Sequence, residues 1–168
     1  MINYLEIFDF VSEVFVLKRK LYAVLCTVMV TILMTACGQD PELTAFHADM
    51  ETFCTKLTNI DTAINSIDPQ KEDAVDELLG KLDELDLIFA EFAKMDFPEE
   101  FDYLEPVAAE SGDYMTEAVK SYHDAYSNGS YNEYTAAYAR ENYYRAYKRV
   151  QIIISFLHGE TPEDVNVE

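Results

Sequence analysis

Basic residues are scarce in this chain. Its 168 residues include 12 Lys and Arg against 32 Asp and Glu, which gives a formal net charge of −20. Nucleic-acid binding requires clustered cations that neutralise phosphates, so this balance argues against DNA or RNA as a partner. It also disfavours flat adsorption to anionic lipid. Such an acidic composition is typical of a well-solvated protein surface.

The sequence patterns that would indicate a reaction or a bound metal are missing. There is no nucleophile elbow and no phosphate-cradling glycine loop. Thr44, Lys120 and Ser155 stand three residues before the histidines, so the Glu-x-x-His pairs of di-iron bundles are absent. The acidic stretch from Asp68 to Glu77 lacks the ligand spacing and central glycine of an EF-hand. We therefore expect a protein that is not an enzyme and has no metal or cofactor.

A long apolar run is found only near the N-terminus. The basic cluster Lys18–Lys20 precedes an apolar or small-residue run of sixteen residues, from Leu21 to Ala36. This run is shorter than the roughly 20 residues that span a bilayer core as a helix. A basic segment, a short apolar core and small residues before a cut are typical of a secretory signal.

The residues Leu33–Cys37, "LMTAC", resemble the lipobox of bacterial lipoprotein precursors. In that family the cysteine thiol receives a diacylglycerol, and signal peptidase II cuts before it. The resemblance implies that Cys37 is the lipidated first residue of an extracytoplasmic protein anchored to a bacterial cell membrane. A plain signal peptide and an uncleaved anchor are the alternatives.

Residues 1–17 do not fit a signal segment well. They include Glu6, Asp9 and Glu13, which are unusual before the basic cluster of a signal. A translation start assigned too early would explain them, and a genuine amphipathic extension is the alternative. We treat residues 1–36 as a signal segment outside the fold and residues 37–39 as the anchor and a short linker.

A first helix is predicted after Asp40, because from Leu43 onward apolar residues recur at alternating spacings of three and four. Asp40 is expected to cap it, with Pro41 in its first turn and Glu42 at the positive end of its dipole. The seam consists of Leu43, Phe46, Met50, Phe53, Leu57, Ile60, Ile64 and Ile67.

Two further helices are predicted by the same spacing. Asp68-Pro69 repeats the start signal before the second helix. Pro98 and Pro106 mark the break before a third helix, at about residues 104–127, which Gly112 weakens slightly. The seam of the second helix consists of Val75, Leu78, Leu82, Leu85, Phe89 and Phe92, and Leu79 and Ile88 widen it. The seam of the third helix consists of Leu104, Val107, Met115, Val119, Tyr122 and Tyr126.

A fourth helix is predicted from about Tyr131 to His158, after the turn "SNGS", and Gly159 ends it. Its seam consists of Ala136, Ala139, Tyr143, Ala146, Val150, Ile153 and Leu157. No segment alternates like a strand. The sequence therefore predicts an all-α fold, an antiparallel up-down-up-down four-helix bundle over residues 40–159, followed by an acidic tail at residues 160–168.

Cysteine is too scarce to stabilise this bundle by disulfides. Of three cysteines, Cys26 leaves with the signal and Cys37 is blocked by lipid, which leaves Cys54 alone. A single cysteine can be a nucleophile, but no histidine or asparagine signature accompanies Cys54. We expect a half-buried thiol and a fold that depends on its hydrophobic core.

Tyrosine is concentrated at the expected turn between the third and fourth helices. Tyr126, Tyr131, Tyr134 and Tyr138 gather there together with Tyr122. A tyrosine ring has an apolar face and a polar tip, which suits contacts with sugars or proteins. These residues are candidates for partner binding. The alternative is that their rings fill the core opposite Ala136 and Ala139.

A basic stripe is predicted on the fourth helix, and it consists of Arg140, Arg145, Lys148 and Arg149. We expect these side chains mainly to pair with acids of a neighbouring helix, such as Asp83, Glu84 and Asp86. A site for an anionic wall polymer is the alternative.

Together these features predict a non-catalytic, membrane-tethered lipoprotein that acts as an extracytoplasmic binding or scaffold module. Its partners would be the membrane, through the diacylglyceryl cysteine at Cys37, and an envelope protein or wall glycan. The alternative is an accessory or regulatory subunit of an envelope enzyme or transporter.

Overall fold

The protein is all-helical in the part that the computed structural model describes, residues 41–126 and 131–159. Its α-helices are α2 (Pro41–Asn65), α3 (Ala74–Phe92), α4 (Glu105–Tyr126) and α5 (Glu133–Leu157), and a short 3-10 helix, η2 (Asp102–Leu104), precedes α4. These residues contain no β-strand, which confirms the predicted all-α class. Cys37, the expected cap Asp40 and the tail at residues 160–168 lie outside the described residues.

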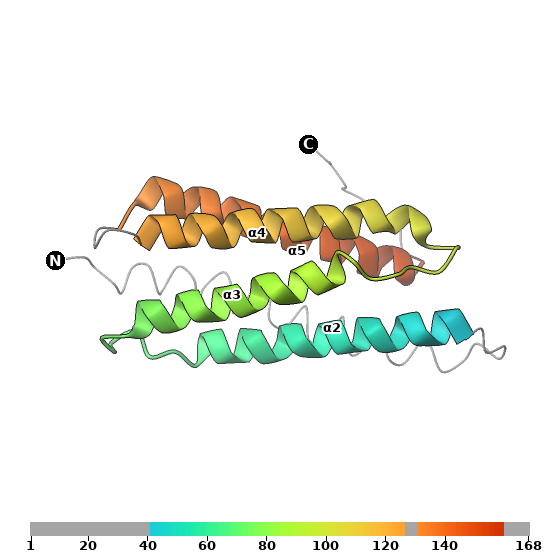
Figure 1. Ribbon diagram of the computed structural model, residues 1–168, viewed down its shortest axis with the longest axis horizontal. Coiled ribbons are helices and arrows are strands. Elements are labelled where there is room, and N and C mark those ends of the chain that lie inside the picture. The colour runs from blue at the N-terminus through green and yellow to red at the C-terminus, as the bar shows by residue number, and fades with distance from the viewer. Residues whose placement is uncertain (1–40, 127–130, 160–168) are drawn as a thin grey trace.

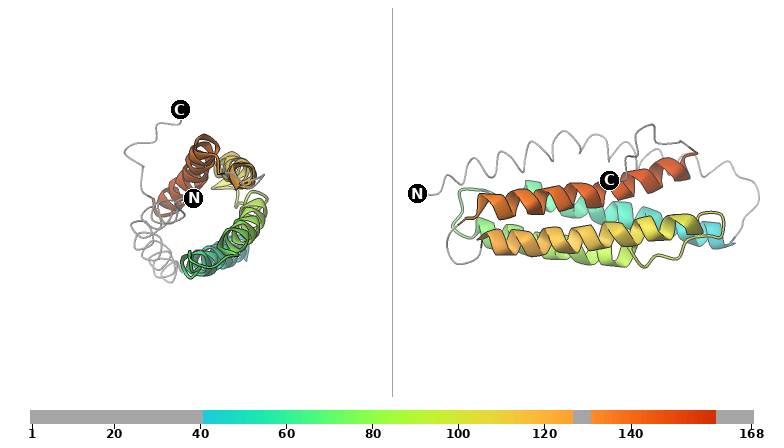
Figure 2. Two further views of the ribbon diagram at one scale, coloured as in Figure 1. Left: turned by 90° about the vertical axis from the view of Figure 1, so that its left-hand side faces the viewer. Right: turned by 90° about the horizontal axis from the view of Figure 1, so that it is seen from above.

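The four long helices lie lengthwise side by side, and each packs against its neighbour in the chain: α2 on α3, α3 on α4, and α4 on α5 (Figure 1). Seen along the helices, they follow one another around an arc in chain order (Figure 2). The start of α2, the α3–α4 connection and the end of α5 lie towards one end of the molecule. The α2–α3 connection and the start of α5 lie towards the other end.

The apolar seams predicted from heptad spacing form the core. Most of their residues are buried in one cluster. The seam residues that are only partly buried are Leu43, Leu57, Val75, Leu79, Ile88, Val107, Tyr122, Tyr126 and Leu157. Buried seam residues include Phe46, Met50, Phe53, Ile60, Ile64, Leu78, Leu82, Leu85, Phe89, Phe92, Met115, Val119, Val150 and Ile153.

Aromatic contacts join the helices within this core. Phe53 of α2 stacks on Phe92 of α3, with 4.1 Å between ring centroids and 11° between ring planes. Phe89 of α3 meets Tyr147 of α5 edge to face, with centroids 5.3 Å apart. Such pairs stabilise by about 0.5–1.5 kcal/mol beyond the area they bury. The same aromatic network therefore links the first helix of the described chain to the last.

The predicted helix ends are partly confirmed. The Thr135 N–H donates to Oδ1 of Asn132, so α5 begins at Glu133, two residues after the predicted start. At the other end Gly159 has a φ of +71°, and its N–H donates to the carbonyl of Phe156. A left-handed residue after a helix suits glycine, so the predicted end of α5 is confirmed.

The predicted start signal at Asp68-Pro69 is wrong, because α3 begins only at Ala74. Oδ1 of Asp68 instead accepts a hydrogen bond from the Gln70 N–H at 3.0 Å, which is the geometry of an Asx turn. Asp and Pro favour turns as well as helix starts, and here the turn conformation prevails.

Gly112 matters for packing, whereas the sequence indicated only a weakened helix. It is buried in α4, and a Cβ atom added there would lie 2.8 Å from the Cβ of Ala93, just after α3. Because the Ala93 methyl is attached directly to the backbone, it can withdraw only if the chain shifts. Two small residues therefore allow α4 to lie close to the end of α3.

Replacing Gly112 with Ala should destabilise the protein by about 1–3 kcal/mol through overpacking, despite the higher helix propensity of alanine. Gly80 provides a matched control, because it lies within α3 and a Cβ there would meet nothing within 4 Å. Gly80→Ala should stabilise by about 0.5–1 kcal/mol. Urea unfolding of both variants measures the difference, and equal effects would contradict the close contact.

Candidate functional site

The structure divides the clustered tyrosines between surface and core. Tyr134 is 90% exposed and Tyr138 is 50% exposed, one turn apart on α5. Tyr126 and Tyr131 are partly buried, and their ring centroids lie 5.4 Å apart. Tyr122 is partly buried against the core cluster. The group therefore includes exposed rings as well as rings that pack towards the core. Tyr134 and Tyr138 are the candidates for contact with a partner.

Two other tyrosines of α5, Tyr143 and Tyr147, belong fully to the core. Their ring centroids lie 4.7 Å apart, and a hydrogen bond joins their hydroxyl groups. Burial raises the pKa of each phenol well above its ordinary value, and the nearby charge of Asp61 raises both further. Each phenol therefore stays neutral in the folded state.

The basic stripe is built around the ring of Tyr114 on α4. The guanidinium carbons of Arg145 and Arg149 lie 5.6 Å and 4.7 Å from the ring centroid. Arg149 is only 7% exposed, and its Nε donates to Oε2 of Glu110 at 3.1 Å. Nη2 of Arg145 donates to Oε1 of Glu141 at 2.5 Å.

The acids that we expected to pair with the basic stripe have other partners. Asp83 contacts His123, Glu84 contacts Lys81, and the Thr116 hydroxyl donates to Asp86. The prediction of a pairing across helices is correct for Arg149 with Glu110 of α4, but Asp83, Glu84 and Asp86 are wrong as the partners of Arg145 and Arg149.

The remaining stripe residues differ in their surroundings. Lys148 is exposed. Arg140 is partly buried, and its charge lowers the pKa of Tyr122 and Tyr131 against the larger, opposite effect of burial. With Arg149 buried and Arg145 in an ion pair, these four residues do not present one open cationic surface.

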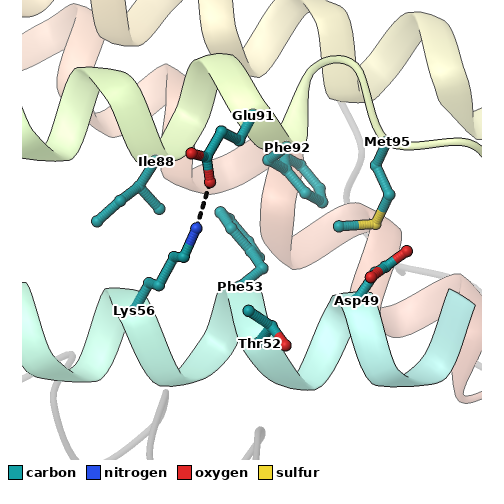
Figure 3. Close-up of a pocket in the computed structure, with 8 residues that line it drawn as sticks. All are labelled: Asp49, Thr52, Phe53, Lys56, Ile88, Glu91, Phe92 and Met95. Atoms are coloured by element: carbon teal, nitrogen blue, oxygen red, sulfur yellow. Dashed lines mark hydrogen bonds and ion pairs between the residues drawn. The ribbon is translucent and has the colours of Figure 1, made fainter. Parts of the chain in front are cut away.

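A groove of about 220 Å³ lies between α2 and α3 (Figure 3). The buried rings of Phe53 and Phe92 form its floor, and the partly buried side chains of Ile88 and Met95 stand at its sides. Asp49, Thr52, Lys56 and Glu91 complete the lining.

The two ends of the groove differ in charge. At one end Lys56 of α2 forms an ion pair with Glu91 of α3, and at the other Asp49 lies beside Met95 (Figure 3). The sequence gives no sign of this groove. Heptad spacing identifies Phe53 and Phe92 as core residues, but a depression between two helices depends on side-chain sizes that periodicity does not describe.

The other sequence candidate, Cys54, is more deeply buried than predicted, at 6% exposure. A thiol inside an apolar core behaves as a small hydrophobic group. Within residues 41–126 and 131–159, no cluster of His, Cys, Asp and Glu could hold a metal ion. None of the helices described there is long and apolar enough to span a membrane.

No protein-family model, curated protein or solved structure matches this chain.

Because Tyr143 and Tyr147 stay protonated in the folded state, alkaline pH should destabilise the protein. Their ordinary pKa is 10.0, so the unfolded chain loses these protons above about pH 10 while the folded chain keeps them. The free energy of unfolding therefore decreases as the pH rises above about 10. The slope approaches about 1.4 kcal/mol per pH unit for each buried phenol.

Tyr147→Phe removes one of these protons and should reduce the alkaline slope by about 1.4 kcal/mol per pH unit. Tyr134→Phe, at the exposed position, is the control and should leave the slope unchanged. Urea unfolding at a series of pH values measures it. Equal slopes in both variants would show that the Tyr147 phenol is not shielded from water.

Proposed function

We propose that this protein is a lipid-tethered, non-catalytic binding or scaffold module at the extracytoplasmic face of a bacterial membrane. The observation that carries the proposal is the placement of Cys37. The residue follows a basic cluster, a short apolar run and small residues, and it lies only four residues before the start of α2 at Pro41. A lipid attached there would hold a compact helical domain close to the bilayer surface.

We further propose that the helices form an antiparallel up-down-up-down bundle. Two observations support this topology. The contacts follow chain order. The start of α2 and the α3–α4 connection lie towards one end, and the α2–α3 connection and the start of α5 lie towards the other (Figure 1). In such a bundle the start of α2 and the end of α5 lie near the membrane. The start of α5, with Tyr134 and Tyr138, then faces away from it.

The distribution of exposed apolar residues favours a binding module over a subunit embedded in a larger assembly. Among the described residues, the exposed large hydrophobic side chains are Leu87, Tyr103, Tyr134 and Tyr138. They come from α3, η2 and the start of α5, so they do not belong to one helix face. An obligate subunit interface is larger and more apolar than such dispersed positions would provide.

Replacing Cys37 with Ala should release the protein from membranes or leave an unprocessed precursor. The diacyl group would supply most of the membrane affinity, at about 0.8 kcal/mol for each buried methylene. Membrane fractionation and labelling with a radioactive fatty acid measure the change. Cys54→Ala is the control and should retain both label and membrane association. Unchanged label in Cys37→Ala would overturn the lipoprotein assignment.

If Tyr134 and Tyr138 contact a partner, replacing both with Ser should weaken in-cell crosslinking of the full-length protein without altering its melting temperature. Aromatic anchors at the centre of an interface contribute about 2 kcal/mol or more to binding. Tyr143→Ser is the matched control, because that ring is buried and its loss should lower stability. Normal crosslinking by a folded double variant would exclude these tyrosines from the interface.

A further inference from the structure

We propose that the groove between α2 and α3 binds a lysine or arginine side chain of a partner polypeptide. This inference rests on the proposed function as a binding module and adds the chemical class of the partner. This groove is separate from Tyr134 and Tyr138, which lie on α5.

The size of the groove favours a single side chain. Its volume of about 220 Å³ lies below the roughly 300–1,000 Å³ typical of pockets for small organic ligands and cofactors. Protein interfaces commonly place one anchoring side chain of the partner in a pocket of this kind. The rigid floor suits such a contact, because Phe53 and Phe92 are 4% and 1% exposed and stack on each other.

The charges around the groove favour a cation. Lys56 and Glu91 neutralise each other in their ion pair. Asp49 is exposed and forms no hydrogen bond or ion pair within the described part of the chain. It lies seven residues before Lys56 on the same helix, about 10 Å along the axis at 1.5 Å per residue. One carboxylate therefore remains uncompensated at the Met95 end.

The shape of a basic side chain matches this combination of surfaces. Lysine and arginine bury an apolar stem while keeping the charged group at the rim. Here the stem would lie along Ile88 and Phe53, and the charge would reach Asp49 beside Met95 (Figure 3). Asp49 would repel an acidic side chain. An apolar side chain would cover the Asp49 carboxylate without pairing it, which is unfavourable because a buried charge needs a partner.

The overall charge of the protein supports the same class of partner. With a net charge of −20, the chain attracts basic polypeptides and speeds their encounter with its surface. This long-range attraction has no preferred position, whereas the groove supplies an apolar floor next to one available carboxylate. The experiment must therefore separate binding at the groove from general attraction to an acidic surface.

The test uses detergent-solubilised full-length protein with ¹³C-labelled methionine and isoleucine methyl groups, titrated with acetylated, amidated Gly-Lys-Gly and Gly-Arg-Gly peptides. The methyl signals of Met95 and Ile88 should shift saturably, and that of Met115, buried in the core, should not. Gly-norleucine-Gly provides an apolar stem without charge and should bind at least fivefold more weakly.

Two isosteric variants locate the charge that matters. Asp49→Asn should weaken binding of the lysine peptide at least fivefold, while Asp113→Asn, which removes another exposed carboxylate, on α4, should change it less than twofold. Thermal melting should confirm that both variants remain folded.

Several results would overturn the inference: no shift at Met95 and Ile88, equal binding of the norleucine peptide, or equal losses from both variants. The last result would indicate general electrostatic attraction. These outcomes are independent of the lipid anchor. A Cys37→Ala variant that stayed acylated would overturn the proposed function while leaving a positive titration intact, and a negative titration would leave the anchor assignment unaffected.

Discussion

The stacked rings of Phe53 and Phe92 are the contact on which the α2–α3 half of the molecule depends. Their centroids lie 4.1 Å apart, so they join the middle of α2 to the end of α3, where Phe92 is the last residue. Phe89, one turn before Phe92, extends the contact to Tyr147 of α5. The same pair forms the floor of the groove. One aromatic stack therefore contributes to the core and shapes a surface feature, which links stability to recognition.

The other half of the molecule is packed by a different principle. Where α4 faces its neighbours, many of the buried residues are small: Ala108, Ser111, Gly112, Ala118, Ser121 and Ala125. Small residues let helix backbones approach closely, as Gly112 does against Ala93. Large rings then occupy the remaining interior from α5, where Tyr143 and Tyr147 share a hydrogen bond. This arrangement explains why tyrosine, with its polar tip, is tolerated deep in an apolar core.

Sequence periodicity predicted the helices and most of the core, because burying one face of a helix requires apolar residues at intervals of three and four. It predicted local geometry less well. Asp68-Pro69 suits a helix start and a turn equally, so the choice depends on how α2 and α3 pack. The significance of Gly112 depends on the position of Ala93, which no local pattern indicates. The groove escaped prediction for the same reason, since its lining comes from two helices.

The basic stripe shows why spacing alone cannot distinguish a binding site from a structural network. Arg145 and Arg149 lie one turn apart, which would suit an extended anion. Both guanidinium groups nevertheless lie over Tyr114, and each pairs with a glutamate. An incoming anion would have to displace Glu110 from the buried Arg149. Breaking a buried ion pair is costly, because it leaves a charge without its partner.

The groove between α2 and α3 presents no such cost to a cation. The Lys56–Glu91 pair already satisfies two charges, so a basic side chain could reach Asp49 without breaking an existing ion pair. Binding a charged group therefore costs less at the groove between α2 and α3 than at the basic stripe of α5.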